Sequence, residues 1–324
     1  MIKKALMSFG VLIGLMVCGE LACRMLWSVS DLSLSPENVH LIDHPTRLWV
    51  QAPNASFTLP EHGSLKTNEL GLRDDPVTLP KPPDEWRILS LGESTTWGHG
   101  VQRHETYSEQ LQTLLTKRGR NTNVINAGVP AYTIQQSAVY LTEEGPRLDP
   151  DIVLVYHQTN DFLPTGAIDS HNPLVKLTAN DRELIRRRAP MAPLLRILFH
   201  SRLYLAIRNA MLRLPSSLPN ADAVTNGPVR VPDTDRRAAL DAMLTTTQSL
   251  GAQLIVVQPL YAIDHTQDTL LRDWCAERQQ LYVETNDIRS QLGRQIQRWF
   301  FADGVHPRPA AHRLIAERIA TRIP

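Results

Sequence analysis

Four short motifs contain the residue types that nucleophilic catalysis requires. Ser94 stands in "GESTTWG", and Asp303 and His306 stand three residues apart in "FFADGVHP". A serine hydroxyl is a poor nucleophile near neutral pH and needs a general base. His306 can be that base, because Asp303 can accept a hydrogen bond from the other imidazole nitrogen and stabilise the imidazolium. We therefore expect Ser94 to be a nucleophile, His306 its base and Asp303 the carboxylate that orients the base.

The other two motifs, "NAGVPAYT" and "HQTND", supply hydrogen-bond donors. Gly128 lacks a side chain and can bring its backbone N–H close to a substrate, while Asn160 offers a side-chain amide. An oxyanion hole needs donors aimed at one point, so we expect the N–H of Ser94, Gly128 and Asn160 to form one. Each motif alone also fits a helix cap, a turn or a surface histidine. Their joint occurrence favours catalysis.

The surrounding chain alternates between strand and helix patterns, which predicts how the motifs are held. Short apolar runs predict strands at 87–91, 123–128, 151–157, 252–259 and 281–285. Segments with helical spacing follow at 104–119, 133–148, 233–251, 269–280 and 309–323. Such alternation predicts a parallel sheet that helices cover on both sides. Ligands bind beyond the carboxyl ends of the strands in these sheets, where the first three motifs stand; the fourth precedes the last helix.

This ordered set of motifs resembles the SGNH/GDSL hydrolase superfamily over about residues 87–324. The resemblance implies an α/β fold: a flavodoxin-like three-layer α/β/α sandwich with a five-stranded parallel sheet in the order 2-1-3-4-5. It also implies the roles of the site residues, namely a catalytic set of Ser94, His306 and Asp303 and an oxyanion hole of Ser94, Gly128 and Asn160.

The chain departs from the superfamily pattern at two positions. The first motif reads Gly-Glu-Ser at 92–94, where the superfamily usually has Gly-Asp-Ser. In the third motif Gln158 stands where a glycine is usual, and its side chain could narrow the acyl pocket or contact the substrate.

The first 27 residues read as a membrane anchor that precedes the hydrolase domain. Lys3 and Lys4 stand before an uncharged stretch at 5–19, and Glu20 and Arg24 follow it one helical turn apart, where they can pair at the membrane edge. An uncleaved signal anchor is favoured over a cleaved signal peptide, because no clean A-x-A site follows. The two lysines predict a cytoplasmic N-terminus. The expected location is thus the bacterial inner membrane, with a single span and the catalytic domain on the periplasmic side.

Three segments are expected along the chain: the anchor at 1–27, a membrane-proximal extended segment at 28–85 and the hydrolase domain at 86–324. Within the second, "TNELGLRDDP" offers Gly71 as a turn residue that Asn68 and Arg73 can fix. This motif and the anchor look like the membrane-attached bacterial branch of the superfamily. The hydrolase domain carries an Arg-rich helical insertion at about 162–232. That insertion reads either as a cap with solvated arginines or as an amphipathic segment that covers the active site or leans on the membrane.

Composition and the missing motifs exclude several functions. A formal net charge of +1 predicts no general affinity for nucleic acid or for anionic membranes, so any basic partner site must be local. We expect no metal and no cofactor, because "RHETY" lacks the second histidine of H-E-x-x-H and neither a P-loop nor a dinucleotide fingerprint occurs. The α/β-hydrolase elbow would need glycine at Thr96.

The sequence therefore predicts a membrane-anchored serine esterase that acts through an acyl-enzyme. The expected substrate is a small-molecule or glycan ester, such as O-acyl groups of carbohydrate or envelope polymer, or a lipid ester. Two alternatives stay open: an O-acyltransferase that passes the acyl group to a sugar hydroxyl, and a non-catalytic glycan-binding envelope protein.

Overall fold

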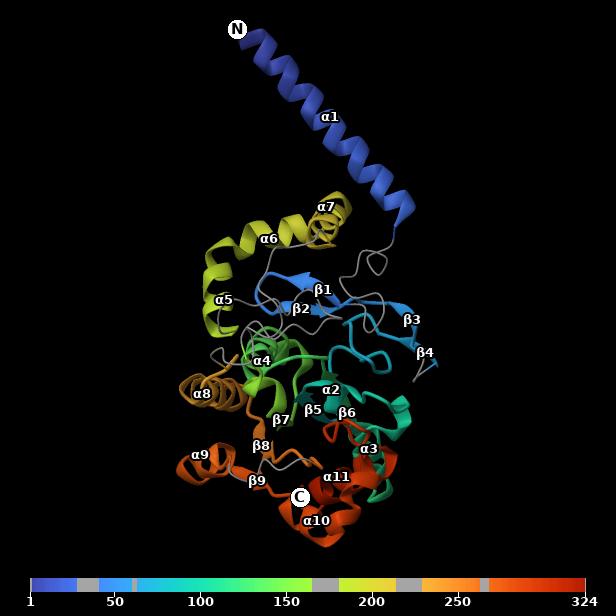
Figure 1. Ribbon diagram of the computed structural model, residues 1–324, viewed down its shortest axis with the longest axis vertical. Helices are drawn as coiled ribbons and strands as arrows, with labels where there is room; N and C mark the ends of the chain where they lie inside the picture. The colour runs from blue at the N-terminus through green and yellow to red at the C-terminus, as the bar shows by residue number, and fades with distance from the viewer. Residues whose placement is uncertain are drawn as a thin grey trace.

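The computed structural model describes residues 2–27, 41–59, 63–164, 181–213, 229–262 and 268–323 (Figure 1). Its centre is a five-stranded parallel sheet with the order β6-β5-β7-β8-β9, which confirms the predicted order 2-1-3-4-5. The strands are β5 (Trp86–Gly92), β6 (Thr122–Gly128), β7 (Ile152–Tyr156), β8 (Gln253–Val257) and β9 (Leu281–Val283).

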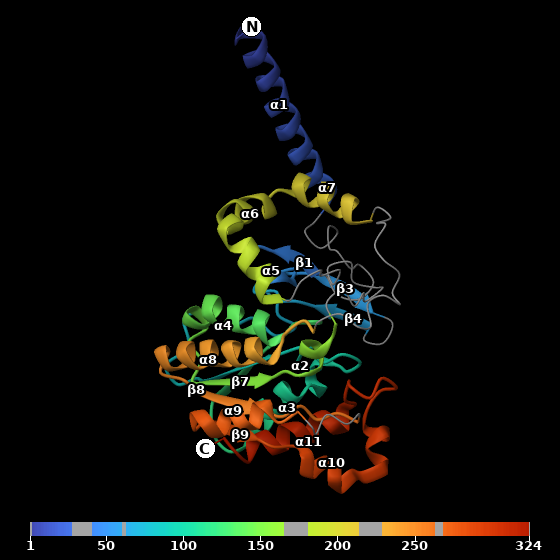
Figure 2. The ribbon, with the colours of Figure 1, turned by 60° about the vertical axis from the view of Figure 1, so that its left-hand side comes forward.

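The strand residues divide between two cores, as in a three-layer sandwich. Leu89 and Leu91 of β5 point into a core with α4 (Ile134–Leu148), α8 (Asp233–Ser249) and α9 (Leu270–Arg278). Ile88 points to the opposite face, which α3 (Tyr107–Lys117), α10 (Asn286–Leu292) and α11 (Pro309–Ala320) cover. Figure 2 shows α4 and α8 on one side of the sheet and α3 and α11 on the other.

The register of the three central strands brings their carboxyl ends level. Gly92, the last residue of β5, pairs with Gly128 of β6 on one side and with Tyr156 of β7 on the other. The residues that follow each strand therefore emerge at one edge of the sheet. This alignment brings the first three motifs together, as the sequence predicts.

Residues 41–66 form two antiparallel hairpins, where the sequence predicts an extended segment. β1 (Leu41–His44) pairs with β2 (Leu48–Gln51), and β3 (Ser56–Leu59) with β4 (Gly63–Lys66). Trp49 of β2 is fully buried and packs in one cluster with Trp97 and Tyr132. The segment does lie against the main domain, but as folded structure that shares its core. Residues 28–40 and 60–62 of the predicted segment lie outside the described residues.

The predicted insertion forms a helical arm, α5 (Asp181–Arg188), α6 (Ala192–Phe199) and α7 (Arg202–Arg213). Residues 165–180 and 214–228 of the insertion lie outside the described residues. The arm lies beside the β1–β2 hairpin, away from the carboxyl ends of β5 and β7, and α7 meets the lower end of α1 (Ile2–Leu26) (Figures 1 and 2). The described part of the insertion thus contacts the helix that the sequence predicts as the anchor.

The N-terminal helix α1 projects from the body of the protein (Figure 1). Within the described part of the chain, Met7–Leu26 is the one stretch long and apolar enough to cross a membrane. Arg24 and Glu20 form the predicted ion pair, with 2.7 Å between Arg24 Nε and Glu20 Oε1.

Candidate active site

Ser94, His306 and Asp303 form a continuous chain of hydrogen bonds. His306 Nε2 lies 2.8 Å from Ser94 Oγ, and His306 Nδ1 lies 2.7 Å from Asp303 Oδ2. Ser94 and His306 are 212 residues apart in sequence, so the fold alone brings them together. The arrangement is that of a nucleophile, a base and an orienting carboxylate.

Ser94 begins the four-residue helix α2 (Ser94–Trp97), which follows β5 through a sharp turn. Gly98 ends this helix with φ +90°, and its N–H donates to the carbonyl oxygens of Ser94 and Thr95. The buried guanidinium of Arg73 then donates to the carbonyls of Trp97, Gly98 and Val101 at 2.7–3.1 Å. Arg73 therefore fixes the carboxyl end of α2, and not the turn around Gly71 as the sequence suggests.

Asn68 does fix that upstream turn, as predicted. Its Oδ1 accepts from the N–H groups of Leu70 and Leu72, each at 2.9 Å. Gly71 has φ +75°, and a Cβ there would lie 2.5 Å from the carbonyl oxygen of Gln51. The turn therefore requires glycine and positions Arg73 under the nucleophile helix.

The loop that carries His306 is held from both of its ends. Phe300 and Pro307 form an antiparallel bridge, and the N–H of Ala262 donates to the carbonyl of Gly304 at 2.8 Å. The ring of Phe301 packs directly over Gly100, where a Cβ would meet it at 2.3 Å. This contact joins the loop of the base to the loop of the nucleophile.

The Asp303 carboxylate is held in its ionised form. Its Oδ1 accepts from the N–H groups of Val305 and His306 at 2.8 and 2.9 Å, while Oδ2 faces the imidazole. Partial burial raises the pKa of Asp303, but these hydrogen bonds and the charge of His306 outweigh it and hold the pKa well below its usual range. The group can therefore stabilise an imidazolium at any pH near neutrality.

Of the predicted oxyanion donors, Asn160 keeps an available hydrogen, whereas Gly128 lies differently from what the sequence suggests. Asn160 Nδ2 donates to the carbonyl of Tyr132 at 3.0 Å, which fixes the amide while leaving its second hydrogen available. The N–H of Gly128 donates at 3.0 Å to Oδ1 of Asn126, so the geometry does not support Gly128 as an oxyanion donor. Its missing side chain has another use, because a Cβ at Gly128 would lie 2.3 Å from the Trp97 nitrogen of α2.

Ala131, which the sequence analysis does not single out, offers the better backbone donor. It has φ +62°, a conformation that non-glycine residues seldom adopt. Within the described part of the chain, neither its N–H nor that of Ser94 has a protein acceptor. Ala131 directly precedes Tyr132, whose carbonyl oxygen accepts from Asn160, so it belongs to the short loop that Asn160 contacts. No sequence signal predicts this conformation, because alanine, unlike glycine, does not indicate a residue with positive φ.

The β1–β2 hairpin supports this loop from behind. Trp49 Nε1 donates to the carbonyl of Pro130 at 3.2 Å, and the Tyr132 hydroxyl donates to the carbonyl of Trp49 at 2.8 Å. These bonds bracket Ala131. They hold the loop on either side of a residue whose backbone conformation is strained.

Glu93, the residue that departs from Gly-Asp-Ser, links the first motif to the third. Its Oε2 accepts from the N–H of Asn160 at 3.0 Å, and its Oε1 accepts from the Tyr261 hydroxyl at 2.9 Å. The longer side chain therefore reaches the loop that carries Asn160. Burial, together with the nearby Asp161 carboxylate, raises the pKa of Glu93 to about 7.

Replacing Glu93 by glutamine should make the protein less sensitive to rising pH. A carboxyl whose pKa rises from 4.5 to about 7 on folding stabilises the fold below pH 4.5, and this contribution is lost as the pH rises through 7. Glu93→Gln keeps an oxygen for the Asn160 N–H but cannot ionise. Urea titration measures the free energy of unfolding of both proteins. The value for the variant minus the value for wild type should increase by on the order of 2 kcal/mol between pH 4.5 and pH 7.5. If the difference in free energy of unfolding between the two proteins does not change with pH, this interpretation of Glu93 is contradicted.

Gln158 does not face a substrate, which differs from the expectation for this position. It is 4% exposed, and its Nε2 donates to Asp268 Oδ2 at 2.8 Å. The guanidinium of Arg236 binds the same carboxylate at 2.7 Å. Gln158 is therefore part of a buried polar network that ties β7 to the start of α9.

Comparisons with known proteins agree with the motifs. The model of the GDSL-like lipase/acylhydrolase family matches residues 90–314. No curated protein matches the chain. Similar solved structures include TesA, at 14% identity and a TM-score of 0.45, covering 72% of this chain and 95% of that one.

Two further similar structures are named as esterase and lipase. The acetyl xylan esterase AlAXEase has 14% identity and a TM-score of 0.47, covering 74% of this chain and 100% of its own. The lipase/acylhydrolase from Enterococcus faecalis has 14% identity and a TM-score of 0.45, covering 74% of this chain and 95% of its own.

Proposed function

Since the chain belongs to the GDSL-like lipase/acylhydrolase family, we propose that it is a membrane-anchored serine esterase with Ser94 as its nucleophile. The observation that carries this proposal is the unbroken chain of hydrogen bonds from Asp303 through His306 to Ser94, at 2.7 and 2.8 Å. A buried structural serine would not need a base held in line by a carboxylate.

The proposed reaction proceeds through an acyl-enzyme. His306 Nε2 takes the Ser94 proton as Oγ attacks the ester carbonyl carbon, and the N–H groups of Ser94, Ala131 and Asn160 bind the oxyanion. His306 then gives that proton to the leaving alcohol, and the carbon–oxygen bond to the alcohol breaks. Water attacks the acyl-enzyme, gives a proton to His306 and releases the acid, and the proton returns to Ser94.

The proposed location is the outer side of the cytoplasmic membrane. It rests on the apolar helix Met7–Leu26 and on the two lysines that precede it. An enzyme held there would meet O-acyl groups of envelope carbohydrate or lipid esters. An alkaline phosphatase fused to the C-terminus should be active if the location is right and inactive if the domain is cytoplasmic.

The reaction can be tested on the full chain in detergent. We expect hydrolysis of p-nitrophenyl acetate, with butyrate and octanoate esters reporting the chain length that the site accepts. A fluorophosphonate should add one phosphonyl group to Ser94, with loss of fluoride, as measured by mass spectrometry. The absence of both turnover and labelling would overturn the proposal. Labelling without hydrolysis would favour acyl transfer to a sugar hydroxyl.

The oxyanion role of Asn160 makes a separate prediction. Asn160→Ala should lower kcat/KM by about 10²–10³-fold, mostly through kcat, because the donor acts on charge that develops in the transition state. Asn121→Ala, which removes an exposed amide far from the site, is the matched control. A loss below about threefold would remove Asn160 from the oxyanion hole.

A further inference from the structure

The helical arm carries an excess of positive charge and an exposed apolar face. Residues 181–213 contain eight arginines against Asp181 and Glu183, although the whole chain has a net charge of only +1. Met191, which directly precedes α6, and Leu194 and Ile197 within it are spaced three residues apart, and between 51% and 72% of each is exposed. α6 and α7 contain four of the eight arginines, namely Arg196, Arg202, Arg208 and Arg213. Exposed apolar side chains next to basic residues are typical of a helical segment that lies in the membrane interface.

The arm is fastened to α1 at a defined depth. Glu20 of α1 accepts from Ser201 Oγ at 2.7 Å and from the N–H groups of Arg202 and Leu203 at 3.1 and 2.9 Å. Leu203 also packs on Gly19, where a Cβ would meet its side chain at 3.2 Å. These contacts hold the N-terminus of α7 against the last two turns of α1.

This attachment sets the level of the arm relative to a bilayer. Glu20 lies within the apolar stretch Met7–Leu26, about 9 Å before its end at 1.5 Å per residue. A carboxylate at that depth needs partners, and Arg24 and the N-terminus of α7 supply them. The start of α7 therefore lies level with Glu20, within the last 9 Å or so of the apolar stretch. From there α6 and α7 extend sideways from α1 (Figure 2).

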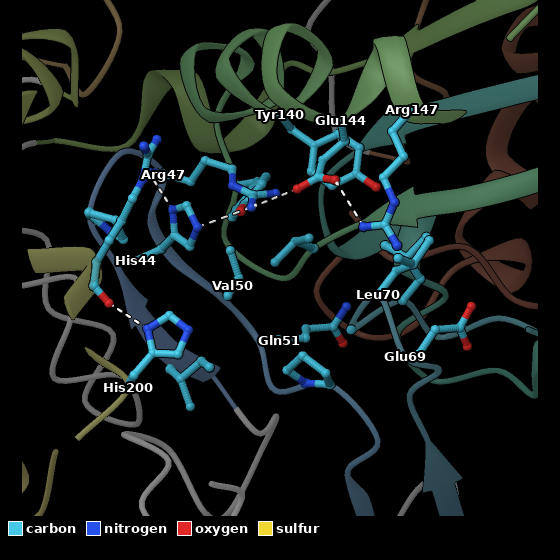
Figure 3. A pocket seen from close by; sticks show the side chains of 18 of the residues that line it. His44, Arg47, Val50, Gln51, Glu69, Leu70, Tyr140, Glu144, Arg147 and His200 are labelled. Carbon is cyan, nitrogen blue, oxygen red and sulfur yellow. Dashed lines mark hydrogen bonds and ion pairs between the residues drawn. The ribbon is translucent and has the colours of Figure 1, made fainter. Parts of the chain in front are cut away.

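A basic cavity of about 470 Å³ lies beneath the arm, between α4, the β1–β2 hairpin and the end of α1 (Figure 3). Two carboxylates, Glu69 and Glu144, line it together with five arginines, which are Arg24, Arg47, Arg147, Arg196 and Arg202. Apolar side chains such as Val50 and Leu70 complete the wall. Among the lining residues the cations outnumber the anions, while Glu143 and Glu20 pair with Arg47, Arg196 and Arg24 from outside the lining. Three of the lining arginines come from α1, α6 and α7, on the side of the anchor.

His44 lies among the arginines of this cavity. Arg47 Nη2 lies 3.1 Å from His44 Nε2 (Figure 3). Burial, followed by the charges of Arg47, Arg196 and Arg188, lowers the pKa of His44 to about 2. His44 is therefore neutral and adds no charge to the cavity.

We propose that α6 and α7 lie on the surface of a bilayer that contains anionic phospholipid, with the apolar face of α6 in the interface and a headgroup phosphate in the basic cavity. The inference rests on the proposed insertion of α1 in the membrane. Arginine residues near an anionic leaflet attract it electrostatically, and guanidinium groups match phosphate geometry. The acyl chains of the bound lipid would run beside α1.

The test uses the full chain in nanodiscs of phosphatidylcholine, alone or mixed with phosphatidylglycerol. Single cysteines replace Leu12, Ile197 or Arg313 in a chain whose three native cysteines are serine, and each carries an NBD fluorophore. Leu12 is in the middle of α1, and Arg313 is exposed on α11 at the far end of the protein. Retained hydrolysis of p-nitrophenyl acetate checks the fold of each variant.

We expect spin-labelled lipids to quench NBD at Leu12 deeply, at Ile197 at a shallow depth and at Arg313 not at all. Quenching at Leu12 without quenching at Ile197 would overturn this proposal and leave the anchor intact. No quenching at Leu12 would overturn the anchor and the proposal that rests on it.

The charges make a second measurement possible. Quenching at Ile197 should be severalfold stronger with phosphatidylglycerol, and Arg196→Gln with Arg202→Gln should reduce it to the level in phosphatidylcholine alone. Arg272→Gln with Arg318→Gln removes the same charge far from the arm and should change nothing. Equal quenching in both lipid mixtures would overturn the role of the anionic headgroup.

Discussion

Ser94→Ala is expected to lower kcat/KM for p-nitrophenyl acetate by about 10⁴–10⁶-fold, and His306→Ala by a similar factor. The two residues act as one unit, because the 2.8 Å bond between Ser94 Oγ and His306 Nε2 is the path of the transferred proton. The double variant should therefore be no slower than either single variant.

The control for this experiment is Ser290→Ala, which removes an exposed serine hydroxyl on α10. It should retain full activity. Circular dichroism should give the same spectrum for the wild type and all four variants. Multiplicative losses in the double variant, or more than a tenth of wild-type activity in Ser94→Ala, would contradict a shared catalytic role.

Asp303→Asn should lower kcat by about 10³–10⁴-fold near neutral pH. An asparagine amide cannot stabilise the imidazolium that forms at His306, and its NH₂ group can bind Nδ1 and hold the wrong tautomer. Asparagine keeps an oxygen for the N–H groups of Val305 and His306, so the loop should stay folded. Steady-state kinetics from pH 6 to 9 measures the loss.

The pH dependence of stability provides an independent check on Asp303. Because folding lowers the pKa of this group below its usual value of 3.8, its stabilising contribution is present above that pH and is lost as the pH falls. The free energy of unfolding of wild type should therefore exceed that of Asp303→Asn near neutral pH, and this difference should disappear as the pH falls below about 4. Asp273→Asn, on the exposed side of α9, should retain full activity. A loss of kcat below tenfold in Asp303→Asn would assign the orienting role elsewhere.

Most of the fold could be predicted, because its signals are local. Each strand of the parallel sheet is an apolar run bounded by turn residues, and the strand-end motifs follow from the chain order. Ser94, His306 and Asp303 are readable for the same reason, since their residue types and positions after strands or before the last helix are visible in sequence.

The features that could not be predicted depend on pairs far apart in the chain. Glu93 reaches the Asn160 N–H across 67 residues, and Gln158 reaches Asp268 across 110. The hairpin strands have four residues each, too few for a period to be visible. The role of Ala131 could not be predicted, because its backbone conformation is imposed by hydrogen bonds from Trp49 and Tyr132 and not by its own residue type.

The contacts of Arg73 and Trp49 have a consequence for how this enzyme can be shortened. The family match begins at residue 90, yet the end of the nucleophile helix and the loop of Ala131 are held by side chains from before that point. A protein cut at residue 86 would leave three backbone carbonyls without their guanidinium partner and would uncover Trp97 and Tyr132. The region that matches the family and the region that folds as a unit therefore begin at different residues. The smallest active fragment should begin at or before Leu41.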